Sequence, residues 1–227
     1  MGLQHAKAIS DANGRPILLD ITNNDEGESL TFHGYPYVHC DVTSELAIDK
    51  AKDEVVSRFG SIDGLINNAA NNQKMEAGDE ITGTRLEDFS LEAWRKDIEV
   101  SLTGSMLCSK IFGSWMAKNG GGVIINISSD LGIIAPDQRI YSQEGLPDEE
   151  QIVKPVSYSV VKHGVIGLTK YLATYWVGKG IRANVLCPGG IFSGQPDELV
   201  SELVTRIPMG RMANQDEYQG AIQFLCS

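Results

Sequence analysis

The chain has 227 residues and a mass of 24.7 kDa, which is room for one α/β domain or for two very small ones. Apolar residues make up 42% of it and charged residues 22%, so a sizeable core can form and wholesale disorder is excluded. The formal charge of −11 argues against nucleic acid and against anionic membrane surfaces, since both are themselves negatively charged.

Short apolar runs alternate along the chain with segments of helical period. The first helical segment covers residues 3–11, and the Asn13-Gly14 pair after it is a common helix stop. Apolar runs at 16–21 and 35–42 predict two strands, and a helix at 44–59 follows them. Further strands are predicted at 63–68, 122–129 and 182–187, with helical segments at 91–118 and 157–178 between them. This alternation predicts a parallel sheet covered by helices on both faces.

The chain shows no internal repeat, no low-complexity tract and no linker that would divide it, so we expect one α/β domain over residues 1–227. Its predicted strands end in small or hydrogen-bonding residues. Because open parallel sheets bind ligands at the carboxyl ends of their strands, these residues predict a shared crevice. They are Asp20, Asp41, Asn67-Asn68, Ser128-Ser129 and Pro188-Gly189-Gly190.

The targeting and cysteine patterns are consistent with a globular protein of the cytoplasm. No apolar run approaches the roughly 20 residues of a membrane helix, and no signal peptide is visible. The cysteines lie far apart and form no CxxC pair, which favours free thiols over a disulfide or zinc framework. The four histidines have no metal-ligand spacing, and we expect no metal site.

The clearest local pattern is Tyr158-Ser159-Val160-Val161-Lys162. A spacing of four places Tyr158 and Lys162 on one face of a helix. A nearby ammonium stabilises a phenolate and lowers the pKa of the phenol from about 10. The pair can therefore move a proton to or from an alcohol oxygen, although Tyr-x-x-x-Lys also occurs by chance.

Four motifs occur in one order and frame: Asn67-Asn68-Ala69-Ala70, the strand-terminal Ser129, the Tyr158–Lys162 pair and Pro188-Gly189. Together they resemble the short-chain dehydrogenase/reductase family, over nearly the whole chain. The resemblance implies a single Rossmann-like, doubly wound parallel sheet. It also implies an NAD-dependent oxidoreductase that interconverts a secondary alcohol and a ketone.

The resemblance also implies roles for individual residues. Tyr158 would be the general acid/base, Ser129 would orient the substrate oxygen, and Lys162 would lower the pKa of the tyrosine and bind the nicotinamide ribose. Ser128 would be structural. The other residues implied to contact the cofactor are Gly2, Asp41, Val42, Asn67, Ala69, Pro188, Gly189 and Ile191.

Asp20 decides the cofactor that we expect. It ends the second strand of the family's fold, where an acidic residue meets the adenosine ribose. A carboxylate there accepts hydrogen bonds from a 2′-hydroxyl and repels a 2′-phosphate, so NAD is preferred to NADP. The alternative is that Asp20 only caps a turn.

The chain departs from the family pattern at its two ends. Gly2 matches the last glycine of the family's phosphate loop, and the strand before that loop has no counterpart. Phe224-Leu225-Cys226-Ser227 falls where the family continues into a last strand. We therefore expect the first and last strands to be missing, two interior sheet edges to be unpaired, and pyrophosphate binding to be poor.

Two further departures lie beside the expected active site. Ser101 stands where the family carries an asparagine that holds a water in the proton path. Ser129 and Tyr158 are 29 residues apart, about twice the usual spacing. The extra residues, 136–155, predict either a loop that binds substrate through Arg139 and Tyr141 or a solvated insertion. The polar stretch 71–90 would form the facing rim.

The inserted loop is similar to that of relatives associated with flagellin or surface-glycan modification, which implies a polar substrate such as a sugar or sugar nucleotide. One alternative is reduction of a 3-oxoacyl thioester, which would fit a shorter Ser–Tyr spacing. A further alternative is a non-catalytic protein or an inactive fragment. The serine at position 101 and the absent phosphate loop favour that alternative. Helices 91–118 and 157–178 match those that the family uses for dimerisation, which implies a homodimer or homotetramer.

Overall fold

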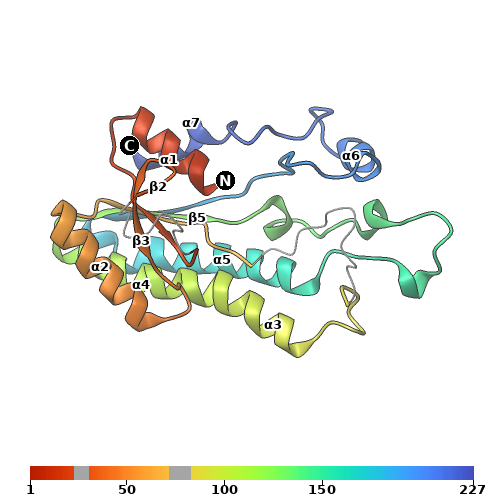
Figure 1. Cartoon of the computed structure of the whole chain (residues 1–227), viewed down its shortest axis with the longest axis horizontal. Coiled ribbons are helices and arrows are strands. Elements are labelled where there is room, and N and C mark those ends of the chain that lie inside the picture. The colour runs from red at the N-terminus through yellow and green to blue at the C-terminus, as the bar shows by residue number, and fades with distance from the viewer. Residues whose placement is uncertain (23–30, 72–82) are drawn as a thin grey trace.

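The structure, a computed structural model, describes residues 1–22, 31–71 and 83–227 (Figure 1). Its strands are β1 (Leu18–Asp20), β2 (Thr31–Phe32), β3 (Tyr35–His39), β4 (Gly64–Asn67), β5 (Gly122–Ile127) and β6 (Ile181–Leu186). Its α-helices are α1 (Gly2–Asp11), α2 (Glu45–Phe59), α3 (Leu91–Ile98), α4 (Gly104–Lys118), α5 (Val156–Tyr175), α6 (Asp197–Val204) and α7 (Gln219–Cys226). A π-helical turn, Glu99–Thr103, joins α3 to α4.

The strands form two three-stranded sheets in the described parts of the chain. One has the order β1-β3-β2 and the other β4-β5-β6. The pairs β1–β3, β4–β5 and β5–β6 are parallel, as expected. Within the described residues β1 and β4 are each paired on one side only. The structure differs from the predicted all-parallel sheet in the short β2, which runs antiparallel to β3.

Helices cover both faces of the sheets, in agreement with the predicted fold class. Figure 1 shows α1 and α7 on one side and α2, α4 and α5 on the other. β5 is buried on both faces because its side chains alternate. Ile125 packs with Ala8 of α1 and Ile222 of α7, whereas Ile124 belongs to the larger core with Phe112 of α4.

Local signals explain where several elements begin and end. The helix predicted at 44–59 starts after Ser44, whose hydroxyl accepts a hydrogen bond from the backbone N–H of Ala47 at 3.2 Å. The strand predicted at 35–42 ends at His39. Asp41 turns the chain soon afterwards, because its Oδ1 accepts hydrogen bonds from the backbone and the hydroxyl of Thr43.

The Asn67 side chain ties the sheet to the helices behind it. Its Nδ2 donates to Asn126 Oδ1 on β5 at 2.7 Å and to Ser109 Oγ on α4 at 3.0 Å. Asn126 in turn donates to Thr169 Oγ1 on α5 at 2.8 Å. This buried polar chain fixes the carboxyl end of β4 relative to α4 and α5, which carry the candidate site.

Candidate active site

Ser129 lies in the loop directly after β5. Its Oγ accepts a hydrogen bond from the N–H of Leu131 at 3.2 Å and donates to Asp130 Oδ1 at 2.7 Å. Gly132 lets this loop approach α5, because a Cβ there would stand 2.5 Å from Ser128 Oγ and 2.8 Å from the Lys162 carbonyl oxygen. The loop that carries Ser129 is therefore packed closely against α5 at Lys162.

Helix α5 presents Tyr158 and Lys162 to this loop. Ser128 Oγ donates to the Lys162 carbonyl oxygen at 2.8 Å, which joins the loop to the helix. Lys162 Nζ donates to the Ile127 carbonyl oxygen at 3.1 Å and lies 5.7 Å from the centroid of the Tyr158 ring. The structure thus brings together Ser129, Tyr158 and Lys162, three residues that were selected from the sequence.

Burial dominates the electrostatics of this triad. It raises the pKa of Tyr158, and a hydrogen bond with Ser129 partly opposes that rise. Burial lowers the pKa of Lys162 to about 8. At neutral pH Tyr158 therefore carries its proton and Lys162 is mostly charged, so the phenol can donate a proton beside an ammonium group.

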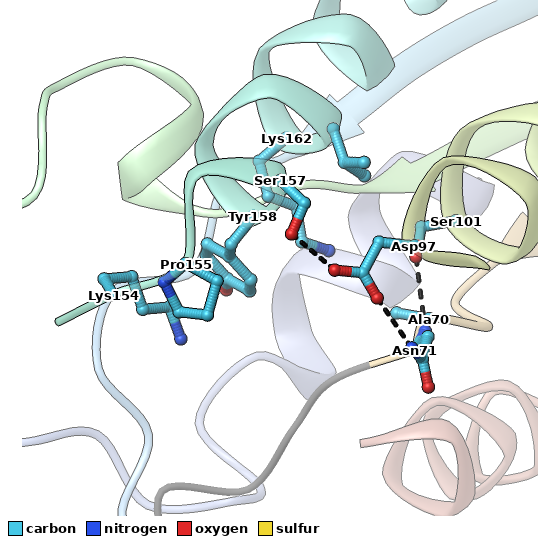
Figure 2. A pocket seen from close by; sticks show the side chains of 10 residues that line it. Ala70, Asn71, Asp97, Ser101, Lys154, Pro155, Ser157, Tyr158 and Lys162 are labelled. Carbon is cyan, nitrogen blue, oxygen red and sulfur yellow. Dashed lines mark hydrogen bonds between the residues drawn. The ribbon is translucent and has the colours of Figure 1, made fainter. Parts of the chain in front are cut away.

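A cluster of which the sequence analysis selected only Ser101 lies next to Tyr158 (Figure 2). Asp97, on the last turn of α3, accepts a hydrogen bond from the Ser157 hydroxyl and another, at 2.6 Å, from Asn71 Nδ2. The backbone N–H of Asn71 donates to Ser101 Oγ at 3.2 Å. With Tyr158, these residues line a cavity of about 20 Å³.

The position of Ser101 bears on the proton path expected from the sequence. Its side chain is buried in the π-helical turn and receives the Asn71 N–H, so it holds the end of β4 against α3. The cavity that it shares with Lys162 has room for about one water molecule. Asp97 could have been suspected from its position one helical turn before Ser101.

The inserted loop 136–155 brings two side chains to Tyr158. The Lys154 ammonium stands 3.9 Å from the centroid of the Tyr158 ring. Burial lowers the pKa of Lys154 to about 8. Burial, together with the charges of Tyr158 and Asp130, raises the pKa of Tyr141 to about 12. Sequence reasoning selected Tyr141 but not Lys154, for which the only signal was a position four residues before Tyr158.

Arg139 occupies a different place in the same loop. Its guanidinium donates to both carboxylate oxygens of Asp137 at 2.8 Å, and the side chain is 84% exposed. Arg206 also bonds to Asp137, and the two arginines hold the pKa of that carboxyl well below its usual range. The structure therefore brings Tyr141, but not the Arg139 guanidinium, to Tyr158. Of the facing rim at 71–90, residues 72–82 lie outside the described part of the chain.

The amino end of α1 faces the carboxyl end of β4. A Cβ at Gly2 would lie 3.3 Å from Asn68 Nδ2, and no side chain caps the start of this helix. Asp20 is exposed at the end of β1, where its Oδ1 accepts hydrogen bonds from the backbone and the hydroxyl of Thr22. Asp41 is likewise exposed, and Ala69 is exposed just after β4.

The remaining candidate cofactor residues lie at or after the carboxyl ends of three strands, β3, β4 and β6. Pro188 and Gly189 follow β6 beside the serine loop, since the Asp130 N–H donates to the Pro188 carbonyl oxygen at 2.9 Å. Ile191 forms an isolated parallel bridge with Ala213. Val42 packs against Gly104, where a Cβ would lie 3.0 Å from Val42 Cγ2. The Asn67 amide nitrogen, expected to line the cofactor, is turned inward as described above.

Comparison with known proteins identifies the class to which this fold and site belong. A family model described as short chain dehydrogenase matches residues 1–202, and the chain belongs to that family. It is 29% identical over 235 residues to a cis-4-hydroxycyclohexanecarboxylate dehydrogenase of Sinomonas cyclohexanicum, covering all of this chain and 85% of the relative.

Two solved structures are similar over nearly the whole chain. A short chain dehydrogenase from Leptospira borgpetersenii with bound NAD+ has a TM-score of 0.82 at 27% identity, covering 100% of this chain and 81% of that one. A gluconate 5-dehydrogenase from Burkholderia cenocepacia, in complex with NADP and tartrate, has a TM-score of 0.80 at 26% identity, covering 99% and 83%. The chain is thus an NAD(P)-dependent oxidoreductase of the alcohol–ketone type.

Two further observations describe the chain outside this site. No helix in the described residues is long and apolar enough to cross a membrane. Within the same residues, no three histidine, cysteine, aspartate or glutamate side chains gather in a way that could hold a metal ion.

Proposed function

We propose that the protein interconverts a secondary alcohol and a ketone on a small polar substrate, with Tyr158 as the general acid/base and NAD as the preferred cofactor. The observation that carries this proposal is the position of Tyr158, whose pKa the Ser129 side chain lowers and whose ring centroid lies 5.7 Å from the Lys162 ammonium. When bound, the nicotinamide supplies or accepts the hydride.

Each residue of the triad has one task in this proposal. In the reductive direction, Tyr158 gives its proton to the substrate oxygen as that oxygen gains negative charge. Ser129 would hold the same oxygen by a hydrogen bond, for which its hydroxyl proton turns from Asp130 Oδ1 to the substrate while the Leu131 N–H keeps Ser129 Oγ in place. Lys162 stabilises the phenolate that remains, because an ammonium close to a phenolate favours the charged form.

The residues at the carboxyl ends of the strands support the binding of a dinucleotide along that edge of the two sheets. The uncapped start of α1 at Gly2 suits a pyrophosphate, because its first N–H groups point outward from the helix. Asp20 supports NAD over NADP, since its exposed carboxylate can accept hydrogen bonds from ribose hydroxyls and repels a 2′-phosphate. Asp41, Val42, Ala69, Pro188, Gly189 and Ile191 would complete this edge, and Asn67 would contribute by fixing the end of β4.

The loop 136–155 supports a polar substrate, because it places Lys154 and the Tyr141 hydroxyl beside Tyr158. Sugars, sugar acids and nucleotide sugars are the classes to try first. The names of the similar proteins, a hydroxycyclohexanecarboxylate dehydrogenase and a gluconate dehydrogenase, agree with a substrate rich in oxygen. Surface-glycan modification is one setting in which such substrates occur.

The oligomeric state belongs to the same proposal. Tyr171, Tyr175 and Val177 are exposed apolar side chains at the end of α5 and just after it, and Met106 is exposed on α4. Their exposure supports a homodimer or homotetramer, because a second copy would remove them from water. Sedimentation velocity measures the mass directly, and a monomer at micromolar concentration would refute this part.

The function is tested by following NADH and NADPH oxidation with a panel of ketones that includes sugars, nucleotide sugars, keto acids and an acetoacetyl thioester. We expect turnover with NADH on a polar ketone, and a loss of at least about 100-fold in Tyr158→Phe. Tyr35→Phe, at a tyrosine on β3 with no part in the site, is the matched control.

Two outcomes would overturn the proposal. If Tyr158→Phe keeps the wild-type rate, Tyr158 is not the acid/base. If no member of the panel is reduced with either nucleotide, the protein is non-catalytic. Turnover confined to the thioester would replace the polar-substrate proposal by 3-oxoacyl reduction.

A further inference from the structure

Lys154 carries a half-buried positive charge to which the proposed proton transfer gives no role. Its Nζ stands 3.9 Å from the centroid of the Tyr158 ring, whereas Lys162 Nζ is 5.7 Å from the same centroid. Tyr158 thus lies between two ammonium groups. Figure 2 shows Lys154 reaching along the tyrosine from the loop, on the side away from Asp97 and Ser101.

The backbone holds Lys154 in this position. Its N–H donates to Gln138 Oε1 at 2.8 Å, and its carbonyl oxygen accepts from Gln138 Nε2 at 3.3 Å. Pro155, which is buried, follows and caps the start of α5. The side chain therefore emerges from a fixed point one helical turn before Tyr158.

No anion neutralises this ammonium within residues 1–22, 31–71 and 83–227. No ion pair or hydrogen bond joins Lys154 Nζ to another group there, and the Tyr158 ring is its contact. Asp130 is the carboxylate that influences it electrostatically. The Asp130 carboxylate is already engaged, because its Oδ1 accepts hydrogen bonds from Ser129 Oγ at 2.7 Å and from the Leu131 N–H at 2.8 Å.

Removing an ammonium group from water costs free energy unless an anion lies beside it. This cost favours the uncharged amine and so lowers the pKa of the group. The pKa of Lys154 is accordingly lowered to about 8. An anionic group on the substrate would remove this cost. The Lys154 ammonium lies over the ring of Tyr158, and the phenol oxygen is attached to the same ring. A single small molecule can therefore contact both groups.

We propose that Lys154 binds a carboxylate on the substrate, so that the protein acts on hydroxy acids and keto acids whose reacting carbon lies at Tyr158. This inference rests on the proposed alcohol–ketone function and adds the charge of the substrate to it. A single ammonium suits a carboxylate, which it can meet with one or two charge-assisted hydrogen bonds. Phosphates are more often held by several donors or by a planar guanidinium.

The test compares each keto acid with its own methyl ester, since the two differ chiefly in charge. The pairs are 4-oxocyclohexanecarboxylate, 4-oxopentanoate and 3-oxobutanoate with their esters. For the wild type we expect kcat/KM to be at least about 10-fold higher for the best acid than for its ester. Lys154→Met should raise KM for the acid by about 10- to 100-fold and change kcat/KM for the ester less than about twofold. Lys154→Arg should retain most of the preference.

Binding gives a second readout that does not depend on turnover. Calorimetry with 4-oxocyclohexanecarboxylate should show binding to the wild type in the presence of NAD and weaker binding to Lys154→Met. Lys179→Met, an exposed lysine beyond α5, is the matched control for loss of one charge. Thermal unfolding of each variant shows whether it is folded.

The outcomes separate this inference from the function on which it rests. If esters are reduced as well as acids, or if Lys154→Met lowers both equally, Lys154 does not recognise a carboxylate and the alcohol–ketone function stands. An equal loss with a shifted pH profile would assign Lys154 to tuning the pKa of Tyr158. If no acid, ester or other ketone is reduced, the proposed alcohol–ketone function is wrong, and the inference about Lys154 is wrong as well.

Discussion

Asp97 accepts a hydrogen bond from Ser157, the residue that directly precedes Tyr158. The second oxygen of the same carboxylate accepts from Asn71 Nδ2 at 2.6 Å, just beyond the end of β4. One side chain on α3 therefore joins the strand end expected to meet the cofactor to the helix turn that carries the acid/base. We therefore expect the alignment of Tyr158 to depend on this carboxylate.

Replacing Asp97 tests this alignment. Asp97→Ala leaves the Ser157 hydroxyl and the Asn71 amide without their acceptor, so we expect the free energy of unfolding to fall by about 2 kcal/mol. We expect kcat to fall about 10-fold, with KM for the nucleotide changing less. Urea unfolding and steady-state kinetics measure the two effects. Lys96→Ala, an exposed neighbour on α3, should change neither, and an unaltered kcat in Asp97→Ala would disprove the positioning role.

The pH dependence of the two reaction directions should differ in sign. Tyr158 must be protonated to reduce a ketone and deprotonated to oxidise an alcohol, and burial raises its pKa. Alcohol oxidation should therefore increase with pH through the whole range below the raised pKa of Tyr158, while ketone reduction stays level and falls only as the pH approaches that pKa. In Lys162→Met the rise in oxidation should shift to higher pH, because the phenolate loses its nearby ammonium. Profiles of kcat/KM from pH 6 to 10 check this, and superimposable profiles would contradict it.

Asp20 should control the choice of nucleotide. In Asp20→Ser we expect the affinity for NADH to fall about 10-fold and that for NADPH to rise, because a carboxylate that repels the 2′-phosphate is removed. Calorimetric titration of both nucleotides measures the ratio. Asp11→Asn, which breaks only an exposed pair with Lys7, is the control. An unchanged ratio would show that Asp20 serves only the turn that it forms with Thr22.

His5 should make the fold sensitive to acid. Its ring is 4% exposed, and neither ring nitrogen has a hydrogen-bond partner in the described part of the chain. Burial, followed by the charge of the amino terminus, lowers its pKa from 6.5 to about 4. The unfolded chain then binds more protons between pH 6.5 and 4, so stability falls as the pH falls through this window.

The variant His5→Leu measures that loss. It should be more stable than the wild type, and its advantage should grow by up to about 3 kcal/mol between pH 7 and pH 4. Urea midpoints at several pH values give the difference. His163→Leu, an exposed histidine, should show no such trend. Parallel stability curves for His5→Leu and the wild type would mean that His5 is protonated in the folded protein.

The sequence predicted those features of the site that depend on short spacings. Tyr158 and Lys162 are four residues apart on one helix, and Ser129 directly follows a strand, so their roles could be inferred locally. The direction of the Asn67 amide could not, because it is set by Asn126 and Ser109, which lie 59 and 42 residues away. Lys154 escaped notice for a similar reason, since its proximity to Tyr158 arises where an irregular loop enters α5.

The missed elements show two different limits. β2 comprises only Thr31–Phe32 and exists because it pairs with β3, so two residues carried no periodic signal. Helix α6, in contrast, did carry a sequence signal that was overlooked. Pro196 precedes it, its first turn is acidic, and apolar residues follow at helical spacing. The resemblance to the family implied an open edge at β1 and at β4, and among the described residues each of these strands pairs on one side only.

The π-helical turn between α3 and α4 determines which side chains of this continuous helical segment face the cavity beside Tyr158 and which face the core. An α-helix advances about 100° per residue, so the extra residue in Glu99–Thr103 rotates everything before it by about that angle relative to everything after it. Asp97 consequently faces the reaction cavity while Phe112 faces the core. Removing one residue from the turn would leave two intact helices and an intact core, yet turn the carboxylate of Asp97 away from Ser157. We therefore expect the catalytic alignment to depend on the number of residues in this turn as well as on their identity.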